Sequence, residues 1–311
     1  MVAPPFTLGV VVVSYNTRDV LATCLESLVS EGVEDVTIVD NGSTDGTLEL
    51  VRDRFPRFRL KINTENRGYG AAANDAVRAS RSSAVLVLNS DTIVETGTLA
   101  SLTAYLLAHP EAGLVGPRLL NPDRSLQPSC FPFPGIIDAL LSETGLHRLL
   151  RVIPGVRERL LRTWSHDRAR RVPWVMGAAL AIRMSAFAAV DGFDEEIFMY
   201  GEEVDFARRL VAAGYETHFT PAATIVHIGG ASSGDQLATY PVRVAATVRY
   251  LHRYSSPLNR LGFLCVMRLV IAARLARDRA RLAVAPGQRR PLLRRRIQTW
   301  KAITYNLGGQ G

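Results

Sequence analysis

Cysteine is scarce in this chain of 311 residues. The three cysteines, Cys24, Cys130 and Cys265, make no closely spaced pair of the kind that holds a metal, and they form no disulfide framework. No apolar run reaches the length that spans a bilayer. The N-terminal MVAPPFTLGVVVVSYN has neither a basic segment nor a small-residue cleavage site, so it predicts no secretory signal. We therefore expect a cytoplasmic protein.

Glycine-rich phosphate loops are also missing. The first expected strand, LGVVVVS over residues 8–14, is followed by Tyr15, Asn16 and Thr17, without the glycines of a dinucleotide-binding turn. The chain has no GxxxxGK[ST] segment either. These absences exclude a Rossmann oxidoreductase and a P-loop enzyme. A nucleotidyltransferase is an alternative function, but it would need a basic, glycine-rich loop just after the first strand, which this chain lacks.

Acidic residues are nearly absent from the end of the chain. From Arg243 to Gly311 there are fifteen Arg or Lys and one acid, Asp278, so this part carries a net charge of +14. Residues 1–242 hold 22 basic and 28 acidic residues, a net charge of −6. A strongly basic tail on a mildly acidic body favours an anionic partner.

The basic tail has a helical pattern. Apolar residues recur at helical spacing over 258–284, opposite arginines, which predicts an amphipathic helix too charged to span a membrane. We expect a basic helical extension over 241–311 that contacts an anionic membrane surface through residues 258–301. The alternative is a helix packed on the rest of the protein or on another subunit of an oligomer. Nucleic acid is not expected as a partner, because the tail has no aromatic platform and no known binding motif.

Strands and helices alternate through the first hundred residues. Apolar strand patterns at 8–14, 36–39, 59–62 and from 84 onward are separated by helical patterns. This order predicts an α/β fold with a mainly parallel central sheet. Further along, we expect a loop over 121–134, a continuous strand over 172–183, a helix over 201–213, and one or two short strands within 216–228.

Polar residues follow the expected strands where α/β proteins place ligands. The central strand, AVLVLNSDT, ends in Asn89, Ser90 and Asp91. A carboxylate at this edge can hold a hard divalent cation, and that cation can hold a diphosphate. Asp40 ends the second strand and can accept a hydrogen bond from an imide or a ribose hydroxyl. Ordinary turns and helix caps are the alternative interpretation of both segments.

Two further segments carry candidate groups. Asn66-Arg67-Gly68-Tyr69-Gly70 supplies backbone donors and a cation before a helix, which suits an anion or a nucleotide as well as a plain glycine loop. Glu202, Glu203 and Asp205 begin a later helix, where acids are also favoured by the helix dipole. The apolar GFDEEIFMY before them indicates a partly buried cleft, in which one carboxylate could act as a general base. His227 at a strand end could complete a metal site with Asp91.

Together these segments resemble one protein family. VVVSYN, VDNGSTDGT, NRGYGAAAN, LNSDT, GAALAIR, GFDEEIFMYGEEVDFARRL and HIGGASS occur in the order and at the approximate spacing of family 2 glycosyltransferases with the GT-A fold. The resemblance covers about residues 7–235 and is closest to the bacterial rhamnosyltransferase type. It implies a nucleotide-sugar donor, a divalent metal, Mg²⁺ or Mn²⁺, and inversion at the anomeric carbon.

The resemblance also implies roles for individual residues. Asp40 would contact the pyrimidine, Asp91 and His227 would hold the metal, and Glu203 falls on the position of the base, with Glu202 and Asp205 as alternatives. The nucleotide-sugar contacts would be Ser14, Asn16, Asp40, Asn66, Arg67, Gly68, Asn89, Ser90 and Asp91. The acceptor side would be lined by Trp174, Met176, Gly177 and Ala178. Two positions depart from the family pattern, because Asn89 replaces the first acid of a DxD motif and a Glu-Glu pair replaces the common Glu-Asp.

These observations predict a catalytic domain over 1–240, with a nucleotide-binding half at about 1–120 and an acceptor half at about 121–240. The expected reaction is inverting transfer of a sugar, with dTDP-rhamnose as a candidate donor, to a hydroxyl of a glycan or a polyprenyl-diphosphate-linked acceptor. It would serve cell-envelope polysaccharide synthesis at the inner face of the cell membrane. A non-catalytic, membrane-associated scaffold that retains the fold is the alternative from a different functional class.

Overall fold

The computed structural model describes residues 5–150, 152–153, 156, 160–229 and 236–308. The chain folds as two compact units. The sheet unit comprises Met1–Pro132 and Trp164–Ser232, and the helical unit comprises Phe133–Thr163 and Ser233–Gly311. The last four residues of the segment HIGGASS lie outside the described residues.

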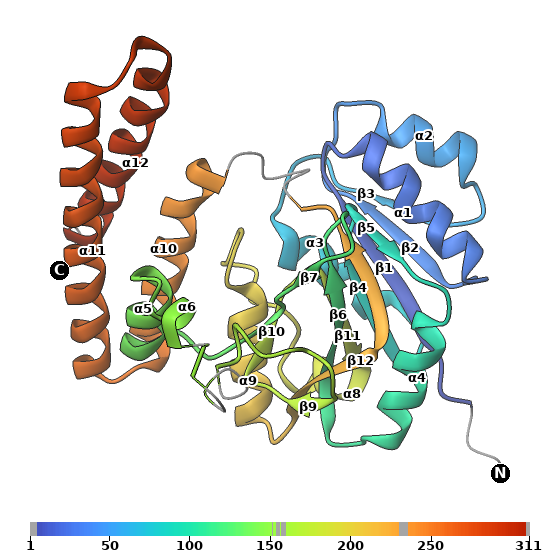
Figure 1. Ribbon diagram of the computed structural model, residues 1–311. Coiled ribbons are helices and arrows are strands. Elements are labelled where there is room, and N and C mark those ends of the chain that lie inside the picture. The colour runs from blue at the N-terminus through green and yellow to red at the C-terminus, as the bar shows by residue number, and fades with distance from the viewer. Residues whose placement is uncertain (1–4, 151, 154–155, 157–159, 230–235, 309–311) are drawn as a thin grey trace. The chain divides into compact units, whose positions relative to one another are not determined.

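The sheet unit contains a ten-stranded mixed sheet (Figure 1). The strands of its main path are β1 Leu8–Ser14, β2 Val36–Asp40, β3 Arg59–Ile62, β4 Ala84–Asn89, β5 Thr92–Val94, β6 Ala112–Leu120, β11 Ala179–Arg183 and β12 Glu216–His227. They lie in the order β3-β2-β1-β4-β11-β6-β12-β5. β3, β2, β1 and β4 are mutually parallel, as are β6 and β12. β11 is antiparallel to both of its neighbours, so the α/β fold with a mainly parallel sheet is confirmed.

Helices cover both faces of this sheet because side chains alternate along each strand. Val10 and Val12 of β1 face α1 (Arg18–Ser30), α2 (Thr47–Arg54) and α4 (Thr98–Ala108). Val11 and Val13 are buried on the opposite face, where α3 (Tyr69–Ala79) packs on β1 and β2 (Figure 1). Burial on both faces explains why these strands are continuous apolar runs.

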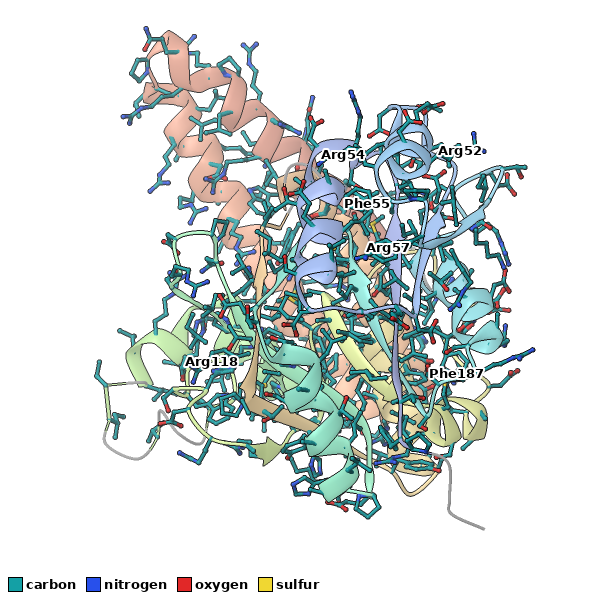
Figure 2. The ribbon with its side chains drawn as sticks, turned by 90° about the vertical axis from the view of Figure 1, so that its right-hand side faces the viewer. Arg52, Arg54, Phe55, Arg57, Arg118 and Phe187 are labelled. Carbon is teal, nitrogen blue, oxygen red and sulfur yellow. The ribbon has the colours of Figure 1, made fainter. Side chains whose placement is uncertain are left out.

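Aromatic residues fix the ends of the covering helices. Phe55 follows α2 and stacks on Phe58 with ring centroids 6.0 Å apart. The exposed side chains of Arg54 and Arg57 lie over these rings (Figure 2). On the opposite face, the buried Phe187 of α8 (Met184–Ala189) packs among aromatic residues before and within α9, Glu202–Ala212 (Figure 2).

The second half of the sheet unit differs from the sequence prediction in three places. The expected strand over 172–183 is interrupted, with β10 (Trp174–Val175) separate from β11. The expected loop over 121–134 contains β7 (Leu126–Gln127), which extends the sheet beside β6, and β8 (Cys130–Phe131), which pairs with β10. β9 (Arg170–Arg171) pairs with β12, which is one strand of 12 residues. Its register shifts between Thr220 and Thr224 because Pro221 lies there and cannot donate to the ladder.

The helical unit contains the predicted amphipathic helix. Its elements are α5 Ile136–Glu143, α6 Leu146–Leu150, α10 Gln236–Tyr254, α11 Pro257–Val284, η1 Gly287–Arg289 and α12 Arg290–Gly308. α11 packs against α5 and α12. It begins at a proline preceded by Ser256, whose hydroxyl accepts a hydrogen bond from the Asn259 N–H at 3.3 Å.

The division into units differs from the expected boundary at residue 240. Helix α10 begins at Gln236 and passes through Pro241, and residues 133–163 belong with the C-terminal helices rather than with the sheet. Pro241 lies in the second turn of this helix, where its missing N–H removes one intrahelical hydrogen bond. The functional division into nucleotide and acceptor halves stays a prediction.

The one acid of the tail is buried inside the helical unit. Asp278 accepts hydrogen bonds from Trp300 Nε1 at 2.8 Å and from Arg296 Nε at 2.9 Å, and Arg277 Nε lies 3.1 Å away. Burial would raise the pKa of Asp278, but these hydrogen bonds and the two arginine charges hold it below its usual value. The anionic side chain is therefore paired within the helical unit, and the exposed charged groups of the tail are basic. Among the described residues, no helix combines the length and the apolar character needed to cross a membrane.

Candidate active site

The carboxyl ends of β4 and β12 bring Asp91 and His227 together. The Ile228 N–H donates to the Asp91 carbonyl at 2.9 Å, and His227 is paired with Thr92 in the sheet. His227 Nε2 lies 3.4 Å from Asp91 Oδ1, and both side chains are largely buried. Strand pairing thus places a carboxylate oxygen and an imidazole nitrogen at one point on the edge of the sheet. Their role as metal ligands stays a prediction.

Gln127 fixes the orientation of this imidazole. Its Nε2 donates to Asn121 Oδ1 at 2.9 Å and to the His227 carbonyl at 3.4 Å, so its Oε1 is the atom that faces His227 Nδ1, at 2.8 Å. Since an amide oxygen only accepts, Nδ1 carries the proton and Nε2 presents its lone pair toward Asp91. This is the arrangement of a metal-ligating histidine supported by a neighbouring acceptor. Gln127 lies in a segment for which the sequence predicts a loop, so its pattern does not indicate this contact.

Three hydroxyl side chains join the ends of β1 and β4. Ser14 Oγ lies 3.0 Å from Thr17 Oγ1, which donates to Ser90 Oγ at 2.7 Å. Asn89 is held by its backbone, whose N–H donates to the Ala178 carbonyl at 3.0 Å. The hydroxyls of Ser14 and Ser90 therefore support the loop that carries Asp91.

The end of β2 presents an open acceptor. Asp40 is fully buried, and its Oδ2 accepts from the Ser43 N–H at 3.0 Å. Its Oδ1 is buried and has no hydrogen-bond partner within the described part of the chain. Asn16, with φ of 50°, accepts from the Thr44 N–H at 2.8 Å, and its own N–H donates to Ser43 Oγ at 2.9 Å. An unsatisfied buried carboxylate oxygen is costly, and a ligand N–H or hydroxyl would satisfy it.

Asn41 ties the 66–70 loop to the end of β2. Its Nδ2 donates to Asn66 Oδ1 at 2.9 Å, and its Oδ1 accepts from the Arg67 N–H at 3.1 Å. The Asn66 side chain is therefore used inside the loop. The Arg67 guanidinium lies 2.9 Å from Asp75 and 3.3 Å from Glu195, so these carboxylates compete with a nucleotide for it.

Gly68 and Tyr69 bring this loop against the segment that precedes α9. Gly68 has φ of +83°, and a Cβ there would lie 2.3 Å from the Phe198 carbonyl oxygen, so only glycine fits. The Tyr69 N–H donates to the same carbonyl at 3.3 Å, and the Tyr69 hydroxyl donates to the Gly177 carbonyl at 3.1 Å. The sequence pattern alone does not indicate this role of Tyr69.

The three acids at the start of α9 have different surroundings. Glu202 is buried, and its Oε2 has no hydrogen-bond partner among the described residues. Glu203 Oε2 accepts from the Gly201 N–H at 3.2 Å, and its carboxyl group lies beside Gly177. Asp205 is also buried and forms an ion pair with Arg209 Nε at 2.7 Å. This pairing suits Asp205 to a structural role.

Electrostatics separate Glu202 from Glu203. Burial raises the pKa of Glu202 well above its usual value, and the negative charge of Glu203 raises it further. The raised pKa favours the protonated form of Glu202. Burial also raises the pKa of Tyr69, to which the charges of Glu202, Glu203 and Asp91 add. The tyrosine hydroxyl therefore stays protonated between the two acidic ends of the site.

The expected acceptor residues divide into two kinds. Trp174 Nε1 donates to the Pro132 carbonyl at 2.7 Å, and its partly exposed ring lies against Phe131. Gly177 is adjacent to Glu203, as described above. Met176 and Ala178 pack into the sheet core. The structure thus brings Gly177 and Trp174 to accessible positions, whereas Ala178 has almost no exposed surface. The roles of all these residues stay predictions.

Comparisons with known proteins agree with this arrangement. The family model described as "Glycosyl transferase family 2" matches residues 9–128. An N-acetylglucosaminyl-diphospho-decaprenol L-rhamnosyltransferase of Mycobacterium tuberculosis is 33% identical over 250 residues, which cover 75% of this chain and 80% of that protein. Rhamnosyltransferase WbbL of Escherichia coli is 24% identical, and the match covers 81% of this chain and 95% of that protein.

A solved structure shares the fold. The mannosyltransferase PcManGT from Pyrobaculum calidifontis, in complex with GDP-Man and Mn²⁺, superposes with a TM-score of 0.57. The match covers 98% of this chain and 88% of that one at 19% sequence identity. At this identity the likeness concerns the fold alone.

Proposed function

The chain belongs to glycosyltransferase family 2, and from this premise we propose that it transfers L-rhamnose from a nucleoside diphosphate donor to a hydroxyl of a lipid-diphosphate-linked glycan. The observation that carries the proposal is the 33% identity, over most of both chains, to an enzyme named for that reaction. The chain is a glycosyltransferase. The donor sugar, the acceptor and the stereochemistry are what the proposal adds.

The donor would lie along the edge of the sheet between Asp40 and Asp91. The open Oδ1 of Asp40 suits the imide N–H of a pyrimidine base. The pair formed by Asp91 Oδ1 and His227 Nε2 fits a divalent cation, Mg²⁺ or Mn²⁺, because both ligand atoms converge and the imidazole is held in the metal-ligating tautomer. Such an ion, when bound, would neutralise charge on the departing diphosphate.

The acceptor would be activated from the opposite side. Glu203 is the candidate that takes the proton from the attacking hydroxyl, because the raised pKa of Glu202 favours its protonated form and Asp205 is paired with Arg209. Tyr69 orients this side of the site through its hydrogen bond to the Gly177 carbonyl. Attack on the face of the sugar opposite the diphosphate would invert the anomeric carbon, through a transition state of oxocarbenium character.

The proposed reaction is tested with a panel of donors. We expect the purified protein, with Mn²⁺ or Mg²⁺, to release nucleoside diphosphate from dTDP-rhamnose in the presence of a polyprenyl-diphosphate N-acetylglucosamine acceptor, and to form a rhamnosylated lipid. UDP-glucose, UDP-N-acetylglucosamine and GDP-mannose serve as matched donors, and EDTA tests metal dependence. Turnover with another sugar alone would contradict the rhamnose assignment. Absence of turnover and of binding for every donor would favour the non-catalytic scaffold.

We also propose that the helical unit binds an anionic membrane surface. Leu258, Leu261, Cys265 and Leu269 recur every three or four residues on α11, so they share one helix face, and all four are exposed. The tail that carries this face has a net charge of +14, and its single acid is buried. An exposed apolar stripe on a basic helix is the pattern of a helix that lies in a membrane interface.

Sedimentation with liposomes tests the membrane proposal. The full-length protein is expected to sediment with vesicles rich in anionic lipid and to be released by salt, since each arginine near the surface adds on the order of 1 kcal/mol. The double variant Leu261→Glu and Leu269→Glu should bind at least about tenfold more weakly, because it removes two insertable side chains. Leu107→Glu, an equally exposed leucine on α4, is the matched control. Wild-type protein that stays in the supernatant at low salt would refute the proposal.

A further inference from the structure

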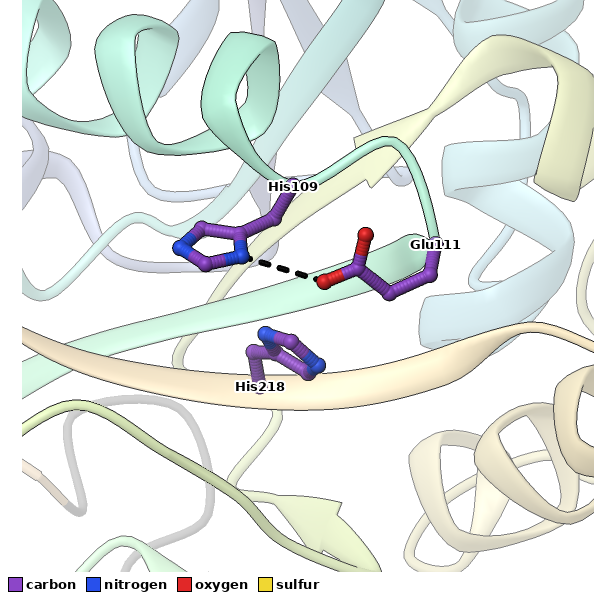
Figure 3. A group of neighbouring side chains, drawn as sticks. All are labelled: His109, Glu111 and His218. Atoms are coloured by element: carbon purple, nitrogen blue, oxygen red, sulfur yellow. Dashed lines mark hydrogen bonds and ion pairs between the residues drawn. The ribbon is translucent and has the colours of Figure 1, made fainter.

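A second group of metal-ligating side chains lies at the other edge of the sheet. His109 directly follows α4, Glu111 lies in the turn before β6, and His218 is the third residue of β12 (Figure 3). Because β6 and β12 are parallel, these residues gather where both strands begin. His218 and His227 are nine residues apart on one strand, roughly 25–30 Å at about 3.3 Å per residue. The cluster is thus remote from the candidate active site.

The three side chains converge on one point. One ligand atom from each lies within 4.8 Å of the other two. His109 Nδ1 is 3.0 Å from Glu111 Oε1, and the rings of His109 and His218 have centroids 5.5 Å apart (Figure 3). His218 is buried, whereas His109 and Glu111 are more than a third exposed, so the point is accessible from solvent.

A carboxylate supports the buried imidazole from behind. Glu216 Oε2 lies 2.8 Å from His218 Nε2 and accepts its proton, while Glu216 Oε1 is held by Arg171 at 2.7 Å. His218 Nδ1 then presents its lone pair, which receives the Tyr105 hydroxyl at 3.1 Å. A carboxylate that holds the far nitrogen of a histidine fixes the tautomer and raises the basicity of the ligating nitrogen.

Glu111 supplies the oxygen ligand of the cluster. Its Oε1 lies 3.0 Å from His109 Nδ1. Tyr105 stacks on His109 with ring centroids 4.3 Å apart, and its hydroxyl contacts His218 Nδ1. The cluster therefore offers one anionic oxygen and two imidazole nitrogens.

We propose that His109, Glu111 and His218 form a transition-metal site, selective for Zn²⁺ over Mg²⁺. Two imidazoles and one carboxylate are a known three-ligand set for Zn²⁺, whereas Mg²⁺ prefers an all-oxygen shell. The ion would displace the proton shared by His109 and Glu111 and would replace the Tyr105 hydroxyl on His218. It would cross-link the end of α4 to the starts of β6 and β12, and the fourth position would remain for water.

Calorimetric titration with Zn²⁺ tests this site. The parent for the experiment is the untagged full chain with Cys265→Ser, which removes the one exposed thiol among the described cysteines. His109→Gln and Glu111→Gln change partly exposed residues and should fold normally. Each should weaken Zn²⁺ binding at least about tenfold, since even supporting residues around a metal site are worth roughly 10–100-fold in affinity. Tyr105→Phe keeps the stacked ring and should bind Zn²⁺ as tightly as the parent or more tightly.

Asp91→Ala is the control that separates the two candidate metal sites. We expect it to keep a Zn²⁺ site of the parent's affinity. We also expect Zn²⁺ to raise the unfolding temperature of Asp91→Ala but not that of the double variant Asp91→Ala and His109→Gln. Mg²⁺ should not compete with Zn²⁺ for this site in any of these proteins. The proposal is overturned if His109→Gln and Glu111→Gln bind Zn²⁺ as the parent does, or if Asp91→Ala abolishes all Zn²⁺ binding. The cluster would then be a hydrogen-bonded support of the strand ends.

Discussion

An Asp91→Ala variant is expected to lose sugar transfer on the order of 10³-fold, the scale on which a positioned electrostatic stabiliser acts. Its binding of nucleoside diphosphate should no longer depend on Mn²⁺ or Mg²⁺. The reason is that Asp91 Oδ1 and His227 Nε2 are the converging ligand atoms at the edge of the sheet, 3.4 Å apart. The fold should survive, because it is the Asp91 carbonyl rather than its side chain that pairs with Ile228.

Calorimetric titration with the nucleoside diphosphate, with and without metal, measures this effect. Asp53→Ala, which removes an exposed acid from α2, is the matched control for charge and should behave as wild type. Gln127→Leu should fall between the two, with metal affinity reduced about 10–100-fold, because it leaves both ligands but releases His227 Nδ1. Metal-dependent affinity that is unchanged in Asp91→Ala would show that the metal is held elsewhere.

Glu203→Gln is expected to bind the donor as wild type does and to lose roughly 10²–10⁴-fold in rate, as removal of a general base does. Glu202→Gln is its matched partner and should remain active, because burial and the charge of Glu203 raise the pKa of Glu202, and glutamine mimics the protonated carboxyl. Single-turnover rates and donor affinities distinguish the two variants. An inactive Glu202→Gln beside an active Glu203→Gln would reverse the assignment of the base.

The same pair predicts how stability depends on pH. Because the pKa of Glu202 is raised in the folded state, the bound proton stabilises the fold fully at pH values below the pKa of the unfolded state. This stabilisation is lost as the pH rises through the pKa of the folded state. Glu202→Gln does not titrate. Its free energy of unfolding relative to wild type should therefore increase as the pH rises from about 4.5, the ordinary value for a glutamate. Denaturant unfolding at several pH values measures this relative free energy of unfolding. A relative stability of Glu202→Gln that decreases as the pH rises would contradict a raised pKa.

Local pattern was sufficient for the first half of the fold. The strands at 8–14, 36–40 and 84–89 are buried on both faces, so each is a largely apolar run. Such a run can be predicted from its own residues alone. The strand over 172–183 could not be read in this way. Its break at Met176 and Gly177 depends on partners elsewhere in the chain, because the Met176 N–H donates to the Ser129 carbonyl and the Gly177 carbonyl accepts from Tyr69.

The sequence by itself determined the α/β alternation, the basic amphipathic helix and the position of the polar strand ends, because each follows from periodicity, composition or neighbouring residues. Only the tertiary structure decided which of those polar groups act together. Gln127 is 100 residues from the histidine whose tautomer it fixes, and Tyr69 is 108 residues from the carbonyl it contacts. Likewise, Glu202 and Glu203 are alike in sequence, and it is the folded chain that raises the pKa of Glu202, through burial and the nearby charge of Glu203.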